Sequence, residues 1–555
     1  MTSPYDTYSS PLAARNASPE MLRLWSPRHK FNTWRRIWLA VAEAQHELGG
    51  WSGTSGTAPS VPLVSKEQVA ELRAVVTREG GITDAEMHAA EKYERDLRHD
   101  VMAHVHALGD SCPKAKGIIH LGMTSQDVVC NADFATLYQA VDLIRTKIAR
   151  LISSLADHAA KHARAPALGF THYQPAQPVT VGRRTAMWAS DLRLTLERLD
   201  GLHPYHGALI GSLFGILRPR GFRGATGTQA SFLALIGDPA RVDAFERASL
   251  ERAMDGVLPG FQRNLIVPPG EFVDHPAGVS EPQASVPGDD GYSREAQFDF
   301  SMLTGQTYPR VIDAFILSDL AATASVLHKI ATDIRLLANR KELDEPFETN
   351  QIGSSAMPYK RNPMRCERIC GLARFVMNLV GNAYDTAATQ WLERTLDDSS
   401  NRRLSLPEAF LALDGALDLM HNVASGLIVH EAMVKKNLMA ELPFMATENI
   451  LMACVKAGGD RQHYHELIRV HAQAAGSRVK DEGLDNDLLD RLQQDPVFHT
   501  PALKTELDWS GLLDPMKYIG RSIEQTERFI TEVVEPLRAQ YGEAIARLNT
   551  TGPRV

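Results

Sequence analysis

The sequence lacks the features that place a chain in a membrane or outside the cell. Residues 1–30 contain no apolar run of signal-peptide length, and no run of about eighteen uncharged apolar residues occurs anywhere. The five cysteines form an odd, scattered set, atypical of a disulfide framework: Cys112, Cys130, Cys366, Cys370 and Cys454. We therefore expect reduced thiols, a cytosolic protein and no contact with a membrane.

The sequence also lacks a metal-ligand cluster and an excess of positive charge. The segment "CERIC" has a C-x-x-x-C spacing, but no second cysteine pair or histidine cluster is placed to complete a zinc site. The formal net charge of −8 argues against a general surface for binding polyanions. We expect no metal and no nucleic-acid partner, and any anionic ligand must be met by a local cluster of positive charge.

Runs of alternating apolar and polar residues are scarce, and helical periodicity dominates instead. In residues 136–163, apolar residues recur at spacings of three and four: Leu137, Val141, Ile144, Ile148, Leu151 and Leu155. Residues 318–339 repeat the pattern: Leu320, Leu327, Ile330, Ile334 and Leu337. The sequence predicts an all-α protein built on a bundle of long helices, and the apolar stripes predict a symmetric homo-oligomer.

Three segments interrupt the helical pattern. Residues 50–63 are rich in glycine, serine, threonine and proline, and residues 203–220 place an apolar, glycine-containing run between prolines. Residues 257–297 are rich in proline and glycine and show no helical period. Such a long segment without periodicity is uncommon inside a compact domain, so we interpret all three as loops.

The loop "GSSAMPYKRNP", residues 353–363, is the first candidate for chemistry. Its glycine and small residues allow backbone N–H groups and serine hydroxyls to approach a ligand. Lys360 adds a compact positive charge and Asn362 a neutral donor, which together suit a carboxylate. Taken alone, such a segment is more typical of a solvated, proline-stiffened turn than of a binding site.

Five other segments carry polar residues that gain weight from occurring together. "GFTHYQPAQPVT" places His172 in a proline-rich turn, "ERDLRHD" places Arg98, His99 and Asp100 in a row, and "GMTSQ" holds Thr124 and Ser125. Two further segments supply local positive charge: Arg365, Glu367 and Arg368, and then Arg394, Ser399, Arg402 and Arg403. A lone histidine or a run of arginines is more often structural, but the ordered set indicates an anion-binding active site.

In this combination the sequence resembles the adenylosuccinate lyase family of the fumarase/aspartase superfamily. The superfamily loop of the form G-S-S-x-M-P-x-K-x-N-P is matched from Gly353 to Pro363. "RHDVMAHVH", "GFTHYQPAQ", "GATGTQASF", "ERTLDDSSNRR" and "ELPFMATENILMA" are similar to segments specific to that family. The resemblance runs to about residue 540, apart from the three loop segments.

The resemblance implies a β-elimination that releases fumarate without cofactor or metal, from adenylosuccinate and from succinylaminoimidazole carboxamide ribotide. Such a C–N lyase needs a base, an acid and a clamp for the carboxylate on which charge develops. By resemblance the base is Ser354, the acid is His172, and Lys360 and Asn362 hold the carboxylate. Glu367 orients and charges the histidine. A serine is a poor base, so closure of the loop must activate it.

The same resemblance implies a set of substrate contacts, with arginines suited to the phosphate of the nucleotide. They are Arg15, Asn16, Arg98, His99, Asp100, Thr124, Ser125, Thr171, Gln229, Asn362, Arg368, Arg394, Ser399 and Arg403. Asn16 stands where the family usually has tyrosine, and an asparagine neither stacks nor reaches as a tyrosine does. His99 is the alternative to His172 for the acid.

The family fold implies a central long-helix bundle over residues 125–429, between smaller helical domains at 1–124 and 430–555. It also implies a homotetramer with active sites shared between chains. The segments at 203–220 and 257–297 are either surface loops or non-coding sequence carried into the chain, and we expect the enzyme to assemble and stay active after deletion of residues 203–216 and 258–296. Two alternatives stay open: a sister lyase acting on argininosuccinate or fumarate, which needs no phosphate site, and a catalytically silent paralogue.

Overall fold

The computed structural model describes residues 6–48, 63–202, 217–258, 303–348 and 351–548. The predicted loop segments lie outside these residues except for their ends, residues 63, 217–220 and 257–258. The expectation about the deletion of residues 203–216 and 258–296 therefore concerns residues that, apart from Leu258, lie outside the described part of the chain.

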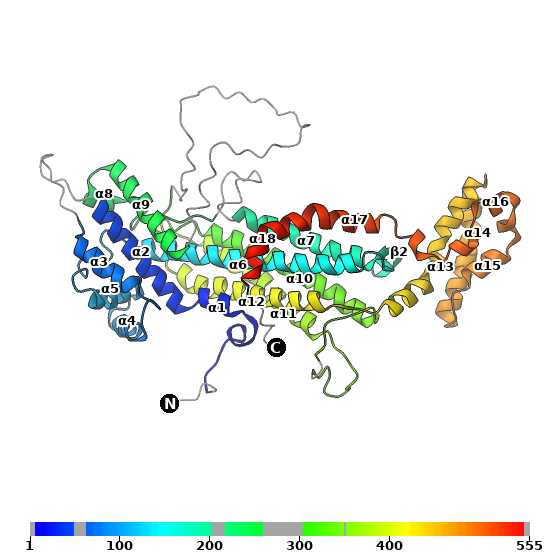
Figure 1. Cartoon of the computed structure of the whole chain (residues 1–555), viewed down its shortest axis with the longest axis horizontal. Coiled ribbons are helices and arrows are strands. Elements are labelled where there is room, and N and C mark those ends of the chain that lie inside the picture. The colour runs from blue at the N-terminus through cyan, green and yellow to red at the C-terminus, as the bar shows by residue number, and fades with distance from the viewer. Residues whose placement is uncertain (1–5, 49–62, 203–216, 259–302, 349–350, 549–555) are drawn as a thin grey trace, which may run out of the picture. The chain divides into compact units, whose positions relative to one another are not determined.

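The described residues are mainly helical and contain only four short strands, which confirms the predicted all-α fold class (Figure 1). Five helices of 22 to 37 residues make up the long-helix bundle: α6 (Ser125–Lys161), α7 (Val181–Leu202), α10 (Val311–Asn339), α11 (Met364–Ala388) and α12 (Asp398–Gly426). The other helices before α10 are α1 (Pro19–Leu24), α2 (Pro27–Glu47), α3 (Lys66–Val76), α4 (Asp84–Leu97), α5 (Asp100–Ser111), α8 (Ala230–Ile236) and α9 (Pro239–Val257). Those after α12 are α13 (Glu431–Lys456), α14 (Arg461–Asp481), α15 (Leu488–Gln494), α16 (Pro501–Glu506), α17 (Ser522–Phe529) and α18 (Glu535–Ala546).

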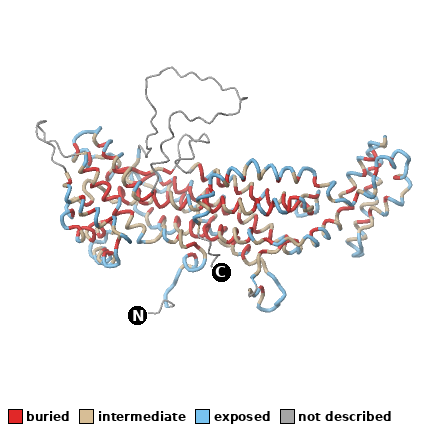
Figure 2. Tube along the Cα trace, in the orientation of Figure 1, coloured by how far each residue is buried: buried red, intermediate tan, exposed pale blue. Residues whose placement is uncertain are grey.

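The apolar stripes predicted from the sequence form the interior of the long helices. In α6, Leu137 and Leu155 at the two ends of the stripe are each 1% exposed, and the apolar stripe residues between them are buried. In α10 the stripe from Leu320 to Leu337 is buried as well, as the red segments of Figure 2 show along these helices. Burial of such stripes is the main source of stability for long helices in water.

The chain divides into two compact units. Unit 1 comprises residues 1–145, 197–321 and 378–412, and unit 2 comprises residues 146–196, 322–377 and 413–555. Each of the five long helices contributes residues to both units. The three domain ranges predicted from the sequence follow chain order and stay a prediction.

Within unit 1, helices α2, α3 and α9 pack together and α4 packs against α5. Hydroxyl caps fix the starts of these helices: Ser65 and Thr83 each form a capping box, at α3 and at α4. The indoles of Trp34 and Trp38 on α2 are almost completely buried. This packing fixes the turn between α4 and α5, which carries predicted site residues.

Unit 2 contains a β-hairpin that the sequence interpretation missed. Strands β1 (Pro166–Thr171) and β2 (Gln174–Thr180) pair antiparallel, with an irregularity between Ala167 and Gly169. Gly169 fits there because a Cβ would lie 2.2 Å from the carbonyl oxygen of Gln177. A second pair, β3 (Leu343–Asp344) with β4 (Ile428–Val429), is only two residues long. Helices α13 to α16 then close a separate apolar cluster that includes Ile450, Leu488 and Phe498.

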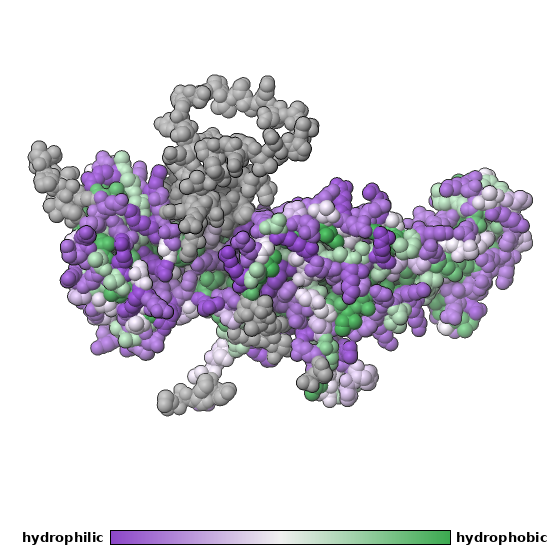
Figure 3. All heavy atoms as spheres, viewed as in Figure 1, coloured by the Kyte–Doolittle hydropathy of each residue, from purple (hydrophilic) through white to green (hydrophobic). Residues whose placement is uncertain are grey.

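Two described helices, α10 and α13, are long and apolar enough by composition to cross a bilayer. In α10, 56% of the most apolar window is buried within the protein, and the helix also carries the charged residues Asp319 and Lys329. Core helices of large proteins share this composition. On the face seen in Figure 3, hydrophilic residues predominate and apolar residues lie among them.

Candidate active site

Unit 1 contains a pocket of about 740 Å³ between the turn that joins α4 to α5 and the first residues of α6 and α12. It is lined by eight of the predicted substrate contacts: Arg98, His99, Asp100, Thr124, Ser125, Arg394, Ser399 and Arg403. These residues come from three distant parts of the sequence, so the fold brings them together. The pocket is large enough for a nucleotide-sized ligand.

Backbone geometry presents the first three of these residues to the pocket. Arg98 ends α4 in the left-handed conformation, at φ 54°, and His99 caps the start of α5. The Nδ1 atom of His99 accepts a hydrogen bond from the N–H of Met102 across 3.3 Å, so Nδ1 carries no proton. The proton therefore lies on Nε2, which faces the hydroxyl of Ser125 at 3.3 Å. The cap fixes both the orientation and the tautomer of His99.

Asp100 is held as a carboxylate by the cations around it. Burial by itself raises the pKa of its carboxyl, but Lys30, Arg403 and the N–H of Val101 outweigh burial, so the pKa lies below its usual value. Arg403 donates to Asp100 Oδ2 across 2.8 Å, and the N–H of Val101 donates to Oδ1 across 2.8 Å. One N–H group of the Arg403 guanidinium is thus bound to Asp100.

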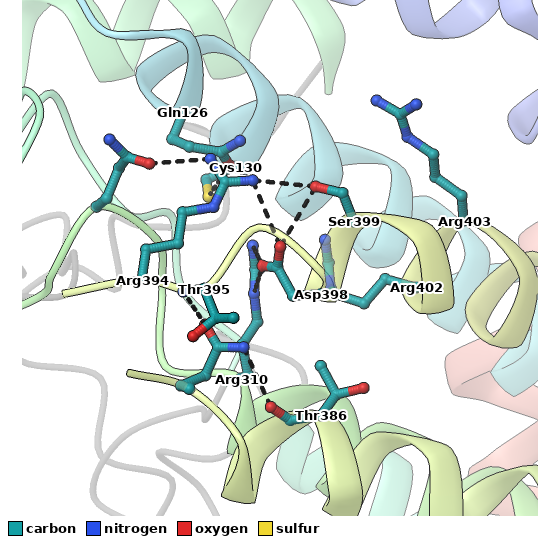
Figure 4. Close-up of polar contacts among 12 residues, drawn as sticks. Gln126, Cys130, Arg310, Thr386, Arg394, Thr395, Asp398, Ser399, Arg402 and Arg403 are labelled. Atoms are coloured by element: carbon teal, nitrogen blue, oxygen red, sulfur yellow. Dashed lines mark hydrogen bonds and ion pairs between the residues drawn. The ribbon is translucent and has the colours of Figure 1, made fainter. Parts of the chain in front are cut away.

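The segment before α12 supplies the other side of the pocket (Figure 4). Arg394 donates to Ser399 Oγ across 3.0 Å and to Gln306 Oε1 across 2.9 Å. Arg402, which the sequence suggested as part of a positive cluster, is buried and bound to Asp313 Oδ2 across 2.6 Å and to Asp133 Oδ2 across 3.0 Å. The positive charge of Arg402 is therefore balanced by two carboxylates, and the predicted substrate-binding arginines of the pocket are Arg98, Arg394 and Arg403.

Three predicted contacts in unit 1 do not line this pocket: Arg15, Asn16 and Gln229. The side-chain N–H of Asn16 donates to the carbonyl oxygen of Pro11 across 3.0 Å. Gln229 donates to the carbonyl of Phe222 across 3.2 Å and to Glu246 Oε2 across 3.0 Å, at the start of α8. Both amides are thus bound within their own segments, and the role of all three residues stays a prediction.

The predicted catalytic residues belong to unit 2. His172 and Tyr173 form the two-residue turn of the β1–β2 hairpin, with φ of 51° and 57°. Positive φ at both central residues is the geometry that fits the twist of two paired strands. The turn leaves the His172 ring exposed, and among the described residues it makes no hydrogen bond or ion pair. Thr171, the last residue of β1, pairs with Gln174.

The loop at residues 353–362 folds back on itself. The backbone N–H of Met357 donates to Ser354 Oγ across 3.2 Å, and the side chain of Asn362 donates to the carbonyl of Gly353 across 2.9 Å. A Cβ at position 353 would lie 2.2 Å from the carbonyl oxygen of Lys360, so glycine is required there. The Lys360 side chain is exposed. One N–H of Asn362 is therefore used to close the loop.

Helix α11 follows this loop and carries Glu367 and Arg368. Its first turn is fixed by Glu345, whose carboxylate accepts from the N–H groups of Arg365 and Cys366 across 2.8 and 3.0 Å. Glu367 is exposed and lies 3.9 Å from the guanidinium of Arg335. No hydrogen bond or ion pair joins Glu367 to His172 in the described part of a single chain. The predicted pairing of these two residues remains a prediction.

Known proteins match the chain over nearly its whole length. The family described as "Adenylosuccinate lyase C-terminus" matches residues 443–529. The family described as "Lyase" matches residues 60–215 and 308–378. Adenylosuccinate lyase of Schizosaccharomyces pombe is 44% identical over 98% of this chain and 98% of its own length. That of Saccharomyces cerevisiae is 41% identical over 98% and 99%. This chain belongs to the adenylosuccinate lyase family.

Solved structures support the fold. The 3-carboxy-cis,cis-muconate lactonizing enzyme from Pseudomonas putida superposes with a TM-score of 0.70 at 23% identity, covering 94% of this chain and 98% of its own. A fumarate lyase from Mesorhizobium sp. BNC1 has a TM-score of 0.67 at 20% identity, covering 95% and 99%. The bundle of fumarase/aspartase type predicted from the sequence is thereby confirmed, and membership of the adenylosuccinate lyase family makes the protein a lyase.

Sequence interpretation missed two residues of the pocket region. Lys30 on α2 lines the pocket, with its ammonium 4.7 Å from the ring centre of Trp34. Burial and then the charge of Arg403 lower the pKa of Lys30. Asp398 lies behind the pocket and contacts Arg394. Lys30 belongs to no motif that the sequence interpretation singled out, and Asp398 lies within "ERTLDDSSNRR" but was given no role.

Proposed function

We propose that the protein cleaves adenylosuccinate to AMP and fumarate, and succinylaminoimidazole carboxamide ribotide to aminoimidazole carboxamide ribotide and fumarate. The observation that carries this proposal is the nucleotide-sized pocket with Arg394, Ser399 and Arg403 along one side. Arginine and hydroxyl donors suit a phosphate, which argininosuccinate and fumarate lack. Membership of the adenylosuccinate lyase family supports the same substrates.

The elimination proceeds without cofactor or metal. Ser354, as an alkoxide, removes the proton from the carbon next to a carboxylate of the succinyl group, and Lys360 with Asn362 stabilises the charge that develops on that carboxylate. The C–N bond then breaks, its electrons leave with nitrogen, and His172 gives nitrogen a proton. The N–H of Met357, 3.2 Å from Ser354 Oγ, supports the first step because it stabilises negative charge on that oxygen.

The proposed enzyme is a cytosolic homotetramer with active sites shared between chains. Two observations support this assembly. The predicted binding residues and the predicted catalytic residues fall mostly in different units. In unit 2, large apolar side chains on the long helices are exposed in the single chain: Met187, Leu194, Leu336 and Phe375. Sedimentation that shows a fully active monomer would contradict the proposal.

Fumarate release from adenylosuccinate, followed in the ultraviolet, tests the activity directly. Argininosuccinate offered at the same concentration is the matched control, because it contains the same fumarate-yielding group but no phosphate. We expect turnover of adenylosuccinate and of the ribotide only. Turnover of argininosuccinate would favour a sister lyase, and no turnover of any substrate by the assembled protein would favour a silent paralogue.

A further inference from the structure

A buried ion pair lies directly behind the anion-binding side of the pocket. The guanidinium of Arg310 donates from Nε across 2.8 Å and approaches from Nη2 at 2.7 Å, both to Asp398 Oδ2. The two side chains are 2% and 0% exposed. A buried pair of this kind contributes little net stability, because both charges lose their hydration. Stability alone therefore does not account for the Asp398 carboxylate.

The second oxygen of Asp398 faces two residues of the pocket (Figure 4). Oδ1 lies 3.4 Å from Arg394 Nη2 and accepts from the Ser399 hydroxyl across 3.3 Å. The same Arg394 nitrogen donates to Ser399 Oγ across 3.0 Å, so the three groups form a closed set. Asp398 thus connects a fixed guanidinium in the interior to the two pocket residues expected to meet the phosphate.

We propose that Asp398 is a positioning residue that holds Arg394 and Ser399 in the arrangement that binds the substrate phosphate. Gln306 holds the other end of the Arg394 guanidinium across 2.9 Å, so Asp398 completes the restraint. A flexible arginine loses conformational entropy when it binds an anion, and a restrained one has lost it already. This inference rests on the proposed function, because it concerns the phosphate half of that substrate.

Two effects of removing the Asp398 charge have opposite signs. If Asp398 acted only through its charge, Asp398→Asn would make the pocket more positive and would lower KM for a phosphorylated substrate. If Asp398 acts by positioning, the amide cannot accept from both Arg310 and Arg394, and KM rises. We expect KM to rise about ten-fold and kcat to stay within about three-fold of the parent. This pattern is typical of losing an interaction that binds the substrate and the transition state equally well.

A second variant separates positioning from folding. Asp398→Asn leaves the buried Arg310 without its charge partner, which destabilises unit 1. The double variant Arg310→Met with Asp398→Asn removes both members of the pair and should recover much of the thermal midpoint. We expect it to keep the raised KM. A double variant that recovers both the midpoint and the parental KM would show that Asp398 is only structural.

Asp319→Asn is the matched control, since Asp319 is also a carboxylate of unit 1 with a side chain only 5% exposed, paired with Arg198 across 3.1 Å. We expect it to leave KM unchanged. Inorganic phosphate binding, measured by calorimetry on the parent and on Asp398→Asn, provides a readout without turnover. Weaker phosphate binding by the variant supports positioning even if the parent fails to cleave adenylosuccinate, and equal or tighter binding overturns it.

Discussion

The backbone N–H of Met357 donates to the hydroxyl oxygen of Ser354 across 3.2 Å. This contact distinguishes Ser354 from its neighbour Ser355, which is exposed. A donor aimed at a hydroxyl oxygen favours the state in which that oxygen carries negative charge. The contact therefore supports the prediction that Ser354, rather than Ser355, is the base.

Ser354→Ala should nearly abolish turnover of adenylosuccinate, because the proton acceptor is lost, while AMP still binds. Ser355→Ala is the matched control and should keep turnover within a few-fold of the parent. Steady-state kinetics of fumarate release and calorimetry with AMP provide the two measurements. Near-normal turnover by the Ser354 variant would show that the base is another group.

Gly353→Ala tests whether the folded-back loop is needed for chemistry. The added Cβ would lie 2.2 Å from the carbonyl oxygen of Lys360, so the loop must shift. We expect kcat to fall by about ten-fold or more, the loss typical of a misplaced catalytic group. Gly371→Ala, on α11 with no atom within 4 Å of the new Cβ, should leave kcat unchanged. Equal kcat in both variants would show that the loop tolerates displacement.

The protein should lose stability as the pH falls from about 6.5 to about 4. Burial, and then the charge of Arg35, lowers the pKa of His104 from 6.5 to about 4. Between these pH values the unfolded chain binds a proton that the folded chain does not, so the free energy of unfolding decreases as the pH is lowered. His104→Phe keeps a ring against Phe31, 3.6 Å away, and removes the titration. From pH 7 to pH 5, the thermal midpoint of the His104→Phe variant should fall less than that of the parent. An equal fall in both proteins would contradict this prediction.

If active sites are shared between chains, as proposed, two inactive variants should restore each other's activity. His172→Ala and Ser354→Ala each lose one proton-transfer group, so tetramers of either alone should be almost inactive. In mixed tetramers, some sites would draw His172 and Ser354 from different, intact chains and recover turnover. Turnover of the mixture is measured after the subunits have exchanged, and mass measurement verifies that mixed tetramers have formed. Verified mixed tetramers without activity would mean that both residues of a site come from one chain.

The long helices could be predicted because the repeated spacing of apolar residues is visible in the sequence without knowledge of the fold. The apolar stripe from Leu137 to Leu155 that this spacing predicts is buried in the structure. The β1–β2 hairpin escaped prediction for a physical reason. Pro175 and Pro178 interrupt β2, and the turn consists of His172 and Tyr173, without the glycine or asparagine that usually marks positive φ. The spacing pattern therefore indicated a turn but no strands.

The pocket shows the same division between local and tertiary information. Arg394, Ser399 and Arg403 stand in a recognisable motif, and the structure brings them into one pocket with His99. Asp398 lies in the same motif, but its partner Arg310 is 88 positions away, so their pairing depends on the fold. The sequence thus indicates which residues meet a ligand more readily than which residues hold them in place.

The backbone conformation of the turn at His172 and Tyr173 affects how the protein could evolve greater thermal stability. A non-glycine residue in the left-handed region costs roughly 1–2 kcal/mol, and this hairpin contains two in succession. Directed evolution for heat resistance alone would favour Asn-Gly at these positions, since that pair adopts the turn without strain. The same exchange would delete His172, the predicted acid. If that prediction holds, selection for heat resistance and selection for activity favour different residues in this turn.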